Sequence, residues 1–400
     1  MKAVLVVPGA AAAVDMVRPG ERHSHFFSLV LVATCPVAFL AAWGFAHLDL
    51  KGIGDWFGIW SVPVIARSSG AASLYDASGL HAAQVALGLA ADRYFPFPYP
   101  PTFLAVFWPL GYLSIGVALV GFMAASFALY LVASIDRWRT VHVVAFNPGV
   151  GINLIAGQSG FLSGGLMLGA TRLLTTHPVV AGALFGLLTY KPQLGIMVPV
   201  ALLAARQWKC IASATATAVL MIVVAYWCFG AEAWMAWWRS LGDYVSQSDA
   251  STHIRTVSPT VLAMLENMGI SHGVATGFQA AAAVASTAAV WMSWRRFDPR
   301  NLQPAVLALC AATFLATPHA LFYDLIMLSG ALILYVTNCG TSLRLWEAAL
   351  ILMGIALPAT SAFFANLDPL VLAAILWMAC RAAIWSSPDT PTQCPVYATA

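Results

Sequence analysis

The chain has 400 residues, of which 60% are hydrophobic and only 9% are charged, and its mean hydropathy is +0.81. A soluble protein of this size needs far more charged surface, so the composition excludes an assembly of soluble domains. It predicts an all-α integral membrane protein that crosses the bilayer many times. The net charge of +3 is small, and we expect no nucleic-acid partner.

The seven cysteines form no C-x-x-C pair and follow no regular spacing. Most of them lie in or beside apolar runs, where a thiol packs as a small hydrophobic group. We therefore expect neither a disulfide framework nor a metal site.

The ends of the chain are predicted to be tails. Residues 1–25 carry Arg18 and Arg22 just before the first apolar run, Phe26–Ala46, which favours a cytoplasmic N-terminus. Residues 26–381 then form one transmembrane domain, and residues 382–400 form a cytoplasmic tail.

Two long loops are expected on the outer face, at residues 47–100 and 231–273, and both are expected to carry amphipathic helices. The first ends in the proline-rich run Phe95–Pro101, which cannot be regular helix. The apolar stretch Thr102–Ile135 is interrupted at Pro109. It reads either as one kinked span or as a short interfacial helix followed by a span.

Further apolar segments follow, and with alternating crossings they give about 12 spans (10–13) with both termini in the cytoplasm. Most lysines and arginines then fall on the cytoplasmic side, which supports this topology. Some segments are too short to cross the bilayer alone. Short helices are tolerated where they line a cavity within the protein, so we expect such a cavity, opening on the outer face. The segments are 141–156, 161–174, 179–190, 192–205, 211–229, 274–294, 302–316, 321–337, 346–364 and 369–380.

Asp55 is the candidate catalytic residue, because it is a carboxylate among glycines and aromatics just beyond the first span. The alternative is a carboxylate that caps a helix or pairs with Lys51. Asp49 and Asp76 are rivals in the same loop, but Asp76 follows Tyr75 in a turn-like Tyr-Asp pattern, where a carboxylate often bonds the backbone.

Other unusual polar residues converge on the outer face in this topology. Lys191 lies within a long apolar stretch, where an ammonium marks a functional site unless it reaches the boundary by snorkelling. A lipid phosphate is its expected counter-charge. His319, His253 and Arg255 are candidate donors to phosphate or sugar, with ordinary structural roles as the alternative. Gln158 is a candidate cleft residue, unless its Gly-Gln-Ser-Gly turn serves only helix packing.

The ordered set of motifs resembles glycosyltransferase family 87, whose members are membrane mannosyltransferase-like proteins of the GT-C fold class. The resemblance covers about residues 45–330 and rests on Asp55-Trp-Phe, Tyr75, Tyr99-Pro-Pro, Gly157-Gln158, Lys191-Pro192 and Pro318-His319. It implies Tyr75 and Tyr99 in the substrate cleft, and Asp55 as the base. It also implies a polyprenyl-phosphate sugar as donor, with mannose as the family default. The acceptor would be an envelope lipid or glycan at a bacterial-type inner membrane.

The residues fit such a reaction. No glycine-rich phosphate loop is present for a nucleotide sugar, and Lys191, Arg255 and His319 supply positive charge for a departing lipid phosphate. Asp55 would take the acceptor proton during an inverting attack, and no resident cofactor is expected. Two alternatives stay open: a twelve-span secondary transporter, or a non-catalytic membrane protein that binds the lipid carrier.

Overall fold

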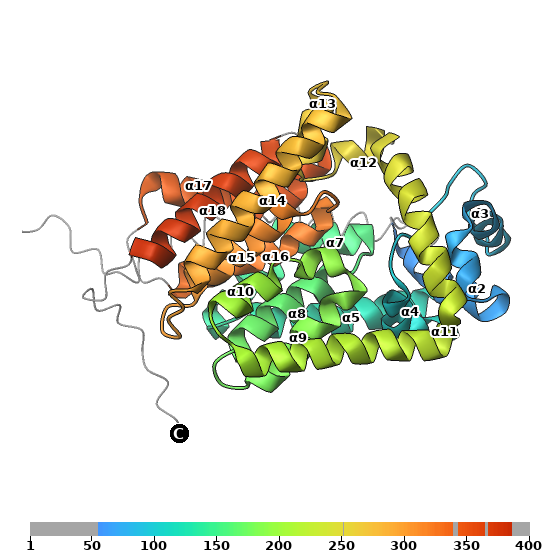
Figure 1. Cartoon of the computed structure of the whole chain (residues 1–400), viewed down its shortest axis with the longest axis horizontal. Coiled ribbons are helices and arrows are strands. Elements are labelled where there is room, and N and C mark those ends of the chain that lie inside the picture. The colour runs from blue at the N-terminus through green and yellow to red at the C-terminus, as the bar shows by residue number, and fades with distance from the viewer. Residues whose placement is uncertain (1–54, 251, 339–342, 365–366, 386–400) are drawn as a thin grey trace, which may run out of the picture.

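A computed structural model describes residues 55–250, 252–338, 343–364 and 367–385, and throughout these ranges the chain forms helices and connections without strands (Figure 1). The predicted all-α class is therefore correct. The expected first span at 26–46, both Asp49 and Lys51, the tail 1–25 and residues 386–400 lie outside the described residues.

From residue 55 on, the expected first outer loop is largely helical. It contains α2 (Trp56–Ser69), η1 (Ala71–Tyr75) and α3 (Ala77–Ala86), followed by an extended segment. Trp56 is fully buried, and its indole Nε1 donates a hydrogen bond to the Ile115 carbonyl at 3.1 Å. The start of α2 is thus packed against the start of α5 (Ile115–Ser134).

The stretch Thr102–Ile135 is two helices. A short α4 (Pro101–Phe107) runs into the 3₁₀ turn η2 (Trp108–Tyr112), and α5 (Ile115–Ser134) follows. Pro109 lies in η2, where its missing N–H and fixed φ prevent a continuous α-helix. Of the two interpretations from sequence, a short helix followed by a long one is the observed arrangement.

The middle of the chain consists of short helices, many of which begin at a proline, the residue best suited to a first helical position. The predicted segment 141–156 is divided at Asn147, whose side chain caps the second part by accepting from the Gly149 N–H at 3.0 Å. The segment 192–205 is also divided. The elements are α6 (Val141–Ala145), α7 (Pro148–Ala156), α8 (Gly160–Leu173), α9 (Pro178–Leu187), η4 (Leu188–Tyr190), η5 (Pro192–Gly195) and α10 (Val198–Ala204).

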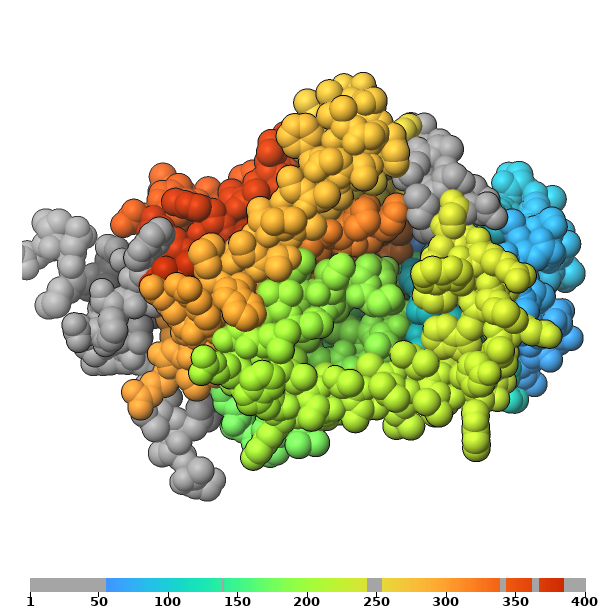
Figure 2. All heavy atoms as spheres, in the orientation of Figure 1, coloured from blue at the N-terminus to red at the C-terminus, as the bar shows by residue number. Residues whose placement is uncertain are grey.

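The longest helix, α11 (Trp208–Ala250), bends at Gly230, where φ is 76° and ψ is 165°. Its first arm runs past α9 and its second turns away from it (Figure 1), and the first arm forms the lower edge of the face in Figure 2. The expected second outer loop, 231–273, therefore begins as helix. It continues through α12 (Thr252–Thr256) and α13 (Val261–Asn267).

The C-terminal helices surround a buried pair. α15 (Gln303–Ala316) and α16 (Ile326–Asn338) are buried along nearly their whole length, and η6 (Phe322–Leu325) begins α16. The helices packed around this pair are α14 (His272–Trp294), α17 (Leu345–Phe364) and α18 (Asp368–Trp385). α18 continues beyond residue 381, where the transmembrane domain was expected to end.

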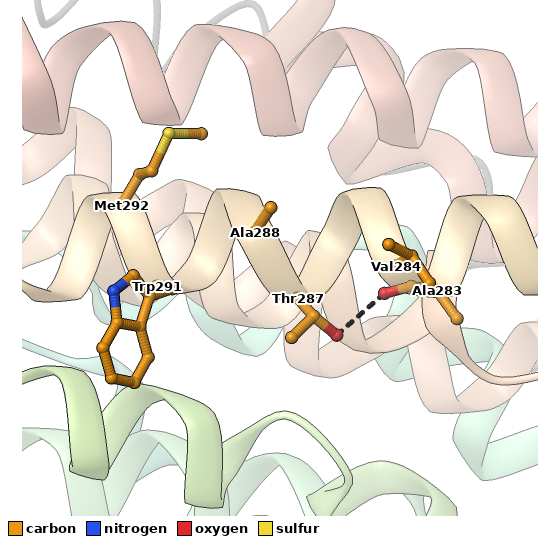
Figure 3. A pocket seen from close by; sticks show the side chains of 6 residues that line it. All are labelled: Ala283, Val284, Thr287, Ala288, Trp291 and Met292. Carbon is orange, nitrogen blue, oxygen red and sulfur yellow. Dashed lines mark hydrogen bonds between the residues drawn. The ribbon is translucent and has the colours of Figure 1, made fainter.

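Three helices are long and apolar enough to cross a bilayer, namely Ile115–Ser134, Trp208–Gly242 and His272–Trp294, and six shorter apolar helices accompany them in the described ranges. This supports a membrane protein, whereas the count of about 12 spans remains a prediction. An open groove of about 500 Å³ lies along α14 (Figure 3), lined by Ala283, Val284, Thr287, Ala288, Trp291 and Met292. None of the candidate site residues lines it.

Candidate active site

Asp55 immediately precedes α2 and is joined to the turn between α7 and α8. Its N–H donates to the Ala156 carbonyl at 2.9 Å, and its Oδ2 accepts a hydrogen bond from Gln158 Nε2 at 2.7 Å. The side chain makes no capping hydrogen bond to α2, although Asp55 occupies the N-cap position. The helix-capping alternative is therefore not observed, and Lys51 lies outside the described residues.

The rival Asp76 is accounted for as a cap. Its carboxylate accepts from the N–H groups of Ser78 and Gly79, both at 3.2 Å, at the start of α3. This is the backbone-bonding role that the Tyr-Asp pattern predicted. Of these two acids of the first loop, Asp55 is the one bonded to another candidate residue.

Gln158 projects toward Asp55 because the chain reverses at Gly157. That glycine ends α7 in the left-handed region with φ 63°, a conformation that disfavours side chains with a Cβ. Gln158 is almost fully buried, and its Oε1 accepts from the Ser159 N–H at 3.2 Å. Both ends of the amide are thus fixed, which sets the amide nitrogen against the carboxylate.

Asn153 and Gly160 attach this turn to η6. The Asn153 amide donates to the Gly149 carbonyl at 3.0 Å and to the Tyr323 carbonyl at 2.8 Å. A Cβ at Gly160 would collide with Asn153 Oδ1 and would lie 2.6 Å from the Tyr323 carbonyl oxygen. The close approach of α8 to η6 therefore requires glycine at this position.

We expect Gly160→Ala to lower the free energy of unfolding by about 1–3 kcal/mol, because the added methyl group must push Asn153 or the η6 backbone aside. Thermal unfolding of the purified protein measures this. Gly242→Ala is the control, since nothing lies within 4 Å of a Cβ there. Equal melting temperatures for the two variants would contradict the packing argument.

Lys191 lies between η4 and η5 and is fully buried. Its Nζ is 3.0 Å from Oδ1 of Asp324, which is also buried, and it lies 5.6 Å and 5.1 Å from the ring centroids of Tyr99 and Tyr323. The expected lipid-phosphate counter-charge is therefore replaced in this structure by a protein carboxylate. The snorkelling alternative is wrong, because the ammonium is enclosed rather than exposed.

Asp324 was missed by the sequence analysis. The signal was present, because it is an acid at the edge of the apolar segment 321–337, and ionisable residues in such segments mark functional sites. The same reasoning that selected Lys191 would have selected Asp324. The two are 133 positions apart, so no local pattern indicates that they pair.

The two candidate tyrosines have different positions. The Tyr75 hydroxyl donates to the Tyr99 carbonyl at 3.0 Å, and burial raises the Tyr75 pKa well above its usual value, which keeps it a donor. The Tyr99 ring stacks on Phe103 with centroids 4.5 Å apart and is partly exposed. Tyr75 thus fixes the loop, and it is Tyr99 that reaches the Lys191 ammonium.

His319 and Arg255 lie on segments that are joined to each other. The Phe322 N–H donates to the Val257 carbonyl at 3.2 Å, which connects the loop after α15 to the end of α12. Nε of Arg255 is buried and has no hydrogen-bond partner among the described residues. His319 is partly buried. His253 belongs to α12, and its side chain lies outside the described part of the structure.

The segments that carry Asp55 and Lys191 meet at Ser159. Gln158 bonds Asp55 on one side and the Ser159 N–H on the other. The carbonyl of Ser159 then accepts from the hydroxyl of Tyr190 at 3.3 Å, and Tyr190 directly precedes Lys191. The two segments are therefore in contact, and the acid and the ammonium each have a partner of their own.

The model of one protein family, glycosyltransferase family 87, matches residues 97–318, which is more than half of the chain. The chain belongs to glycosyltransferase family 87. No curated protein and no solved structure is significantly similar to it.

Membership of glycosyltransferase family 87 makes the protein a membrane glycosyltransferase, which uses a sugar donor and an acceptor. The family match is shorter than the resemblance predicted from the motifs. It includes Tyr99, Gln158, Lys191, His253 and Arg255, whereas Asp55 and Tyr75 precede it and His319 and Asp324 follow it. Within the described ranges, no group of three His, Cys, Asp or Glu side chains is placed to hold a metal ion.

Proposed function

We propose that this glycosyltransferase uses a polyprenyl-phosphate-linked sugar as donor, with mannose as the family default. The acceptor is an envelope lipid or glycan on the extracytoplasmic face of a bacterial-type inner membrane. No resident cofactor takes part, because the lipid-linked sugar is a substrate that already carries a leaving group. The observation that carries this proposal is the Asp55 carboxylate, which accepts a hydrogen bond from Gln158 at 2.7 Å, on a turn that also contacts the segment of the buried Lys191.

Asp55 is the general base of this mechanism. The acceptor hydroxyl oxygen attacks the anomeric carbon while the bond from that carbon to the phosphate oxygen breaks. The electron pair of the broken bond leaves with the phosphate, and the hydroxyl proton passes to Asp55. The anomeric configuration is inverted, because a single displacement occurs. Gln158 orients the carboxylate by donating a hydrogen bond to it.

The departing phosphate needs positive charge and hydrogen-bond donors. Arg255 offers a buried Nε–H that has no partner among the described residues, on a segment bonded to the loop that carries His319. Arginine suits this role because its planar group binds phosphate oxygens in pairs. Lys191 adds charge from behind Tyr99, where Asp324 balances it.

Gln158→Leu is expected to lower kcat about tenfold to a hundredfold, with little change in the KM for the donor. The variant keeps the volume but leaves the Asp55 carboxylate without its amide donor. Steady-state kinetics of sugar transfer measure both constants. Gln279→Leu is the matched control, because Gln279 is an equally buried amide whose partners are Leu262 and Leu315. An equal loss of kcat in both variants would contradict a specific role for Gln158.

The donor class is tested with purified protein in lipid nanodiscs. Polyprenyl-phosphate sugars and nucleotide sugars, each radiolabelled in the sugar, are offered with a membrane lipid extract as acceptor. We expect label to enter the acceptor only from the lipid-linked donors. Transfer from nucleotide sugars alone would overturn the proposal. Solute uptake into proteoliposomes without any transfer would favour a transporter.

A further inference from the structure

The Lys191–Asp324 pair has little net charge, although it lies in the region where the donor phosphate is proposed to bind. Both side chains are buried, and their charged atoms are 3.0 Å apart. An ion pair this close exerts only a weak field at a distance, because the two charges cancel. The positive charge of Lys191 therefore attracts a distant anion only weakly as long as Asp324 is ionised.

The Lys191 ammonium has three N–H donors, of which one points to Asp324. On its other sides lie the faces of two aromatic rings, Tyr99 and Tyr323, both within cation–π range. Tyr323 is buried, whereas Tyr99 is partly exposed and belongs to the loop before α4. Lys191 is fully buried, so an anion reaches its ammonium only if the partly exposed Tyr99 ring moves aside. The anion then replaces a weak ring contact and leaves the Asp324 contact intact.

We propose that Asp324 sets the charge of the donor-phosphate site, so that the site accepts a phosphodiester and releases a phosphomonoester. This inference rests on the proposed function, in which the donor is a phosphodiester with one negative charge. The product that remains, the polyprenyl phosphate, is a monoester whose charge approaches −2 above pH 6. A strongly positive site would hold that product and slow turnover. Asp324 prevents this by balancing Lys191, which makes it a positioning and specificity residue rather than a catalytic one.

The test compares two ligands that differ by one methyl group and one charge: farnesyl phosphate, a monoester, and methyl farnesyl phosphate, a diester. Equilibrium binding is measured at pH 8 with the full-length protein in nanodiscs. Asp324→Asn keeps the shape of the side chain and an acceptor oxygen for Lys191 but removes the negative charge. We expect the substitution to tighten binding of the monoester about tenfold and binding of the diester much less, because the gain in affinity grows with the negative charge of the ligand.

Two variants serve as controls. Asp324→Glu retains the charge and is expected to keep the wild-type ratio of the two affinities. Asp368→Asn removes another buried carboxylate, at the start of α18, and is expected to leave the ratio unchanged. If Asp324→Asn tightens binding of both ligands equally, or weakens binding of both, the proposal is overturned and the ion pair has a purely structural role.

Asp324→Asn also leaves a buried ammonium uncompensated, so its folding is measured in parallel. A phosphate that replaces the carboxylate must raise the melting temperature of this variant more than that of the wild type. A variant that stays unfolded with farnesyl phosphate present would count against the inference.

The proposed function fails in a different way. The ratio of monoester to diester affinity could depend on Asp324 as expected while the protein transfers no sugar from a lipid-linked donor. That result would support the phosphate site and overturn the proposed reaction. If the wild type binds farnesyl phosphate no better than farnesol, both are overturned.

Discussion

Replacing Asp55 with asparagine is expected to lower kcat for sugar transfer about 10³-fold, within the range that a positioned general base contributes. The amide cannot accept the acceptor proton, although it has nearly the same shape as the carboxylate. Donor binding is expected to change little, because in the proposed mechanism the phosphate is bound elsewhere, by Arg255, His319 and Lys191. Steady-state transfer and equilibrium binding of farnesyl phosphate measure the two effects separately.

Asp76→Asn is the matched control, because it makes the same chemical change in the same part of the chain. Asp76 caps α3, and asparagine is an equally good N-cap. We expect wild-type turnover from this variant. Wild-type turnover from Asp55→Asn as well would remove Asp55 from the mechanism.

Replacing Lys191 with methionine is expected to lower the free energy of unfolding by about 3–5 kcal/mol, because the substitution leaves the Asp324 carboxylate buried without its partner. The sequence alone predicts a different result, namely weaker donor binding with the fold intact. The expectation from the structure differs because the Lys191 ammonium lies 3.0 Å from the Asp324 carboxylate. Thermal unfolding in detergent, with and without farnesyl phosphate, measures the effect.

The double variant Lys191→Met/Asp324→Leu separates stability from binding. Replacing both members of a buried ion pair with apolar groups is often neutral or stabilising, so we expect most of the lost stability to return. Donor binding is expected to remain weak, since the cation is still missing. A double variant that binds farnesyl phosphate like the wild type would contradict any role for Lys191 in phosphate binding.

Much of the fold was predictable, because apolar runs in a membrane protein end where prolines, glycines or charges interrupt them. The expected segment 161–174 is the observed helix Gly160–Leu173, and 302–316 is Gln303–Ala316. The breaks inside apolar segments were harder to predict. The division at Asn147 depends on a side chain that caps the following helix, which hydrophobicity does not indicate.

The sequence identified residues of the candidate site better than it indicated which of them contact each other. Polarity within apolar surroundings identified Asp55, Gln158 and Lys191. It did not indicate that Gln158 holds Asp55, because that bond joins positions 103 residues apart. Nor did it show that Tyr75 supports a backbone carbonyl. Such pairings arise from packing between distant helices and become visible only in three dimensions.

The anomeric configuration of the product tests most directly the claim that Asp55 acts as a base in a single displacement. A lipid-linked sugar of known configuration is converted in one turnover, and the configuration of the new linkage is determined by nuclear magnetic resonance. The mechanism predicts the opposite configuration in the product. Retention would require either a covalent intermediate on a protein nucleophile or attack on the face from which the phosphate departs. Either route would contradict the role assigned to Asp55.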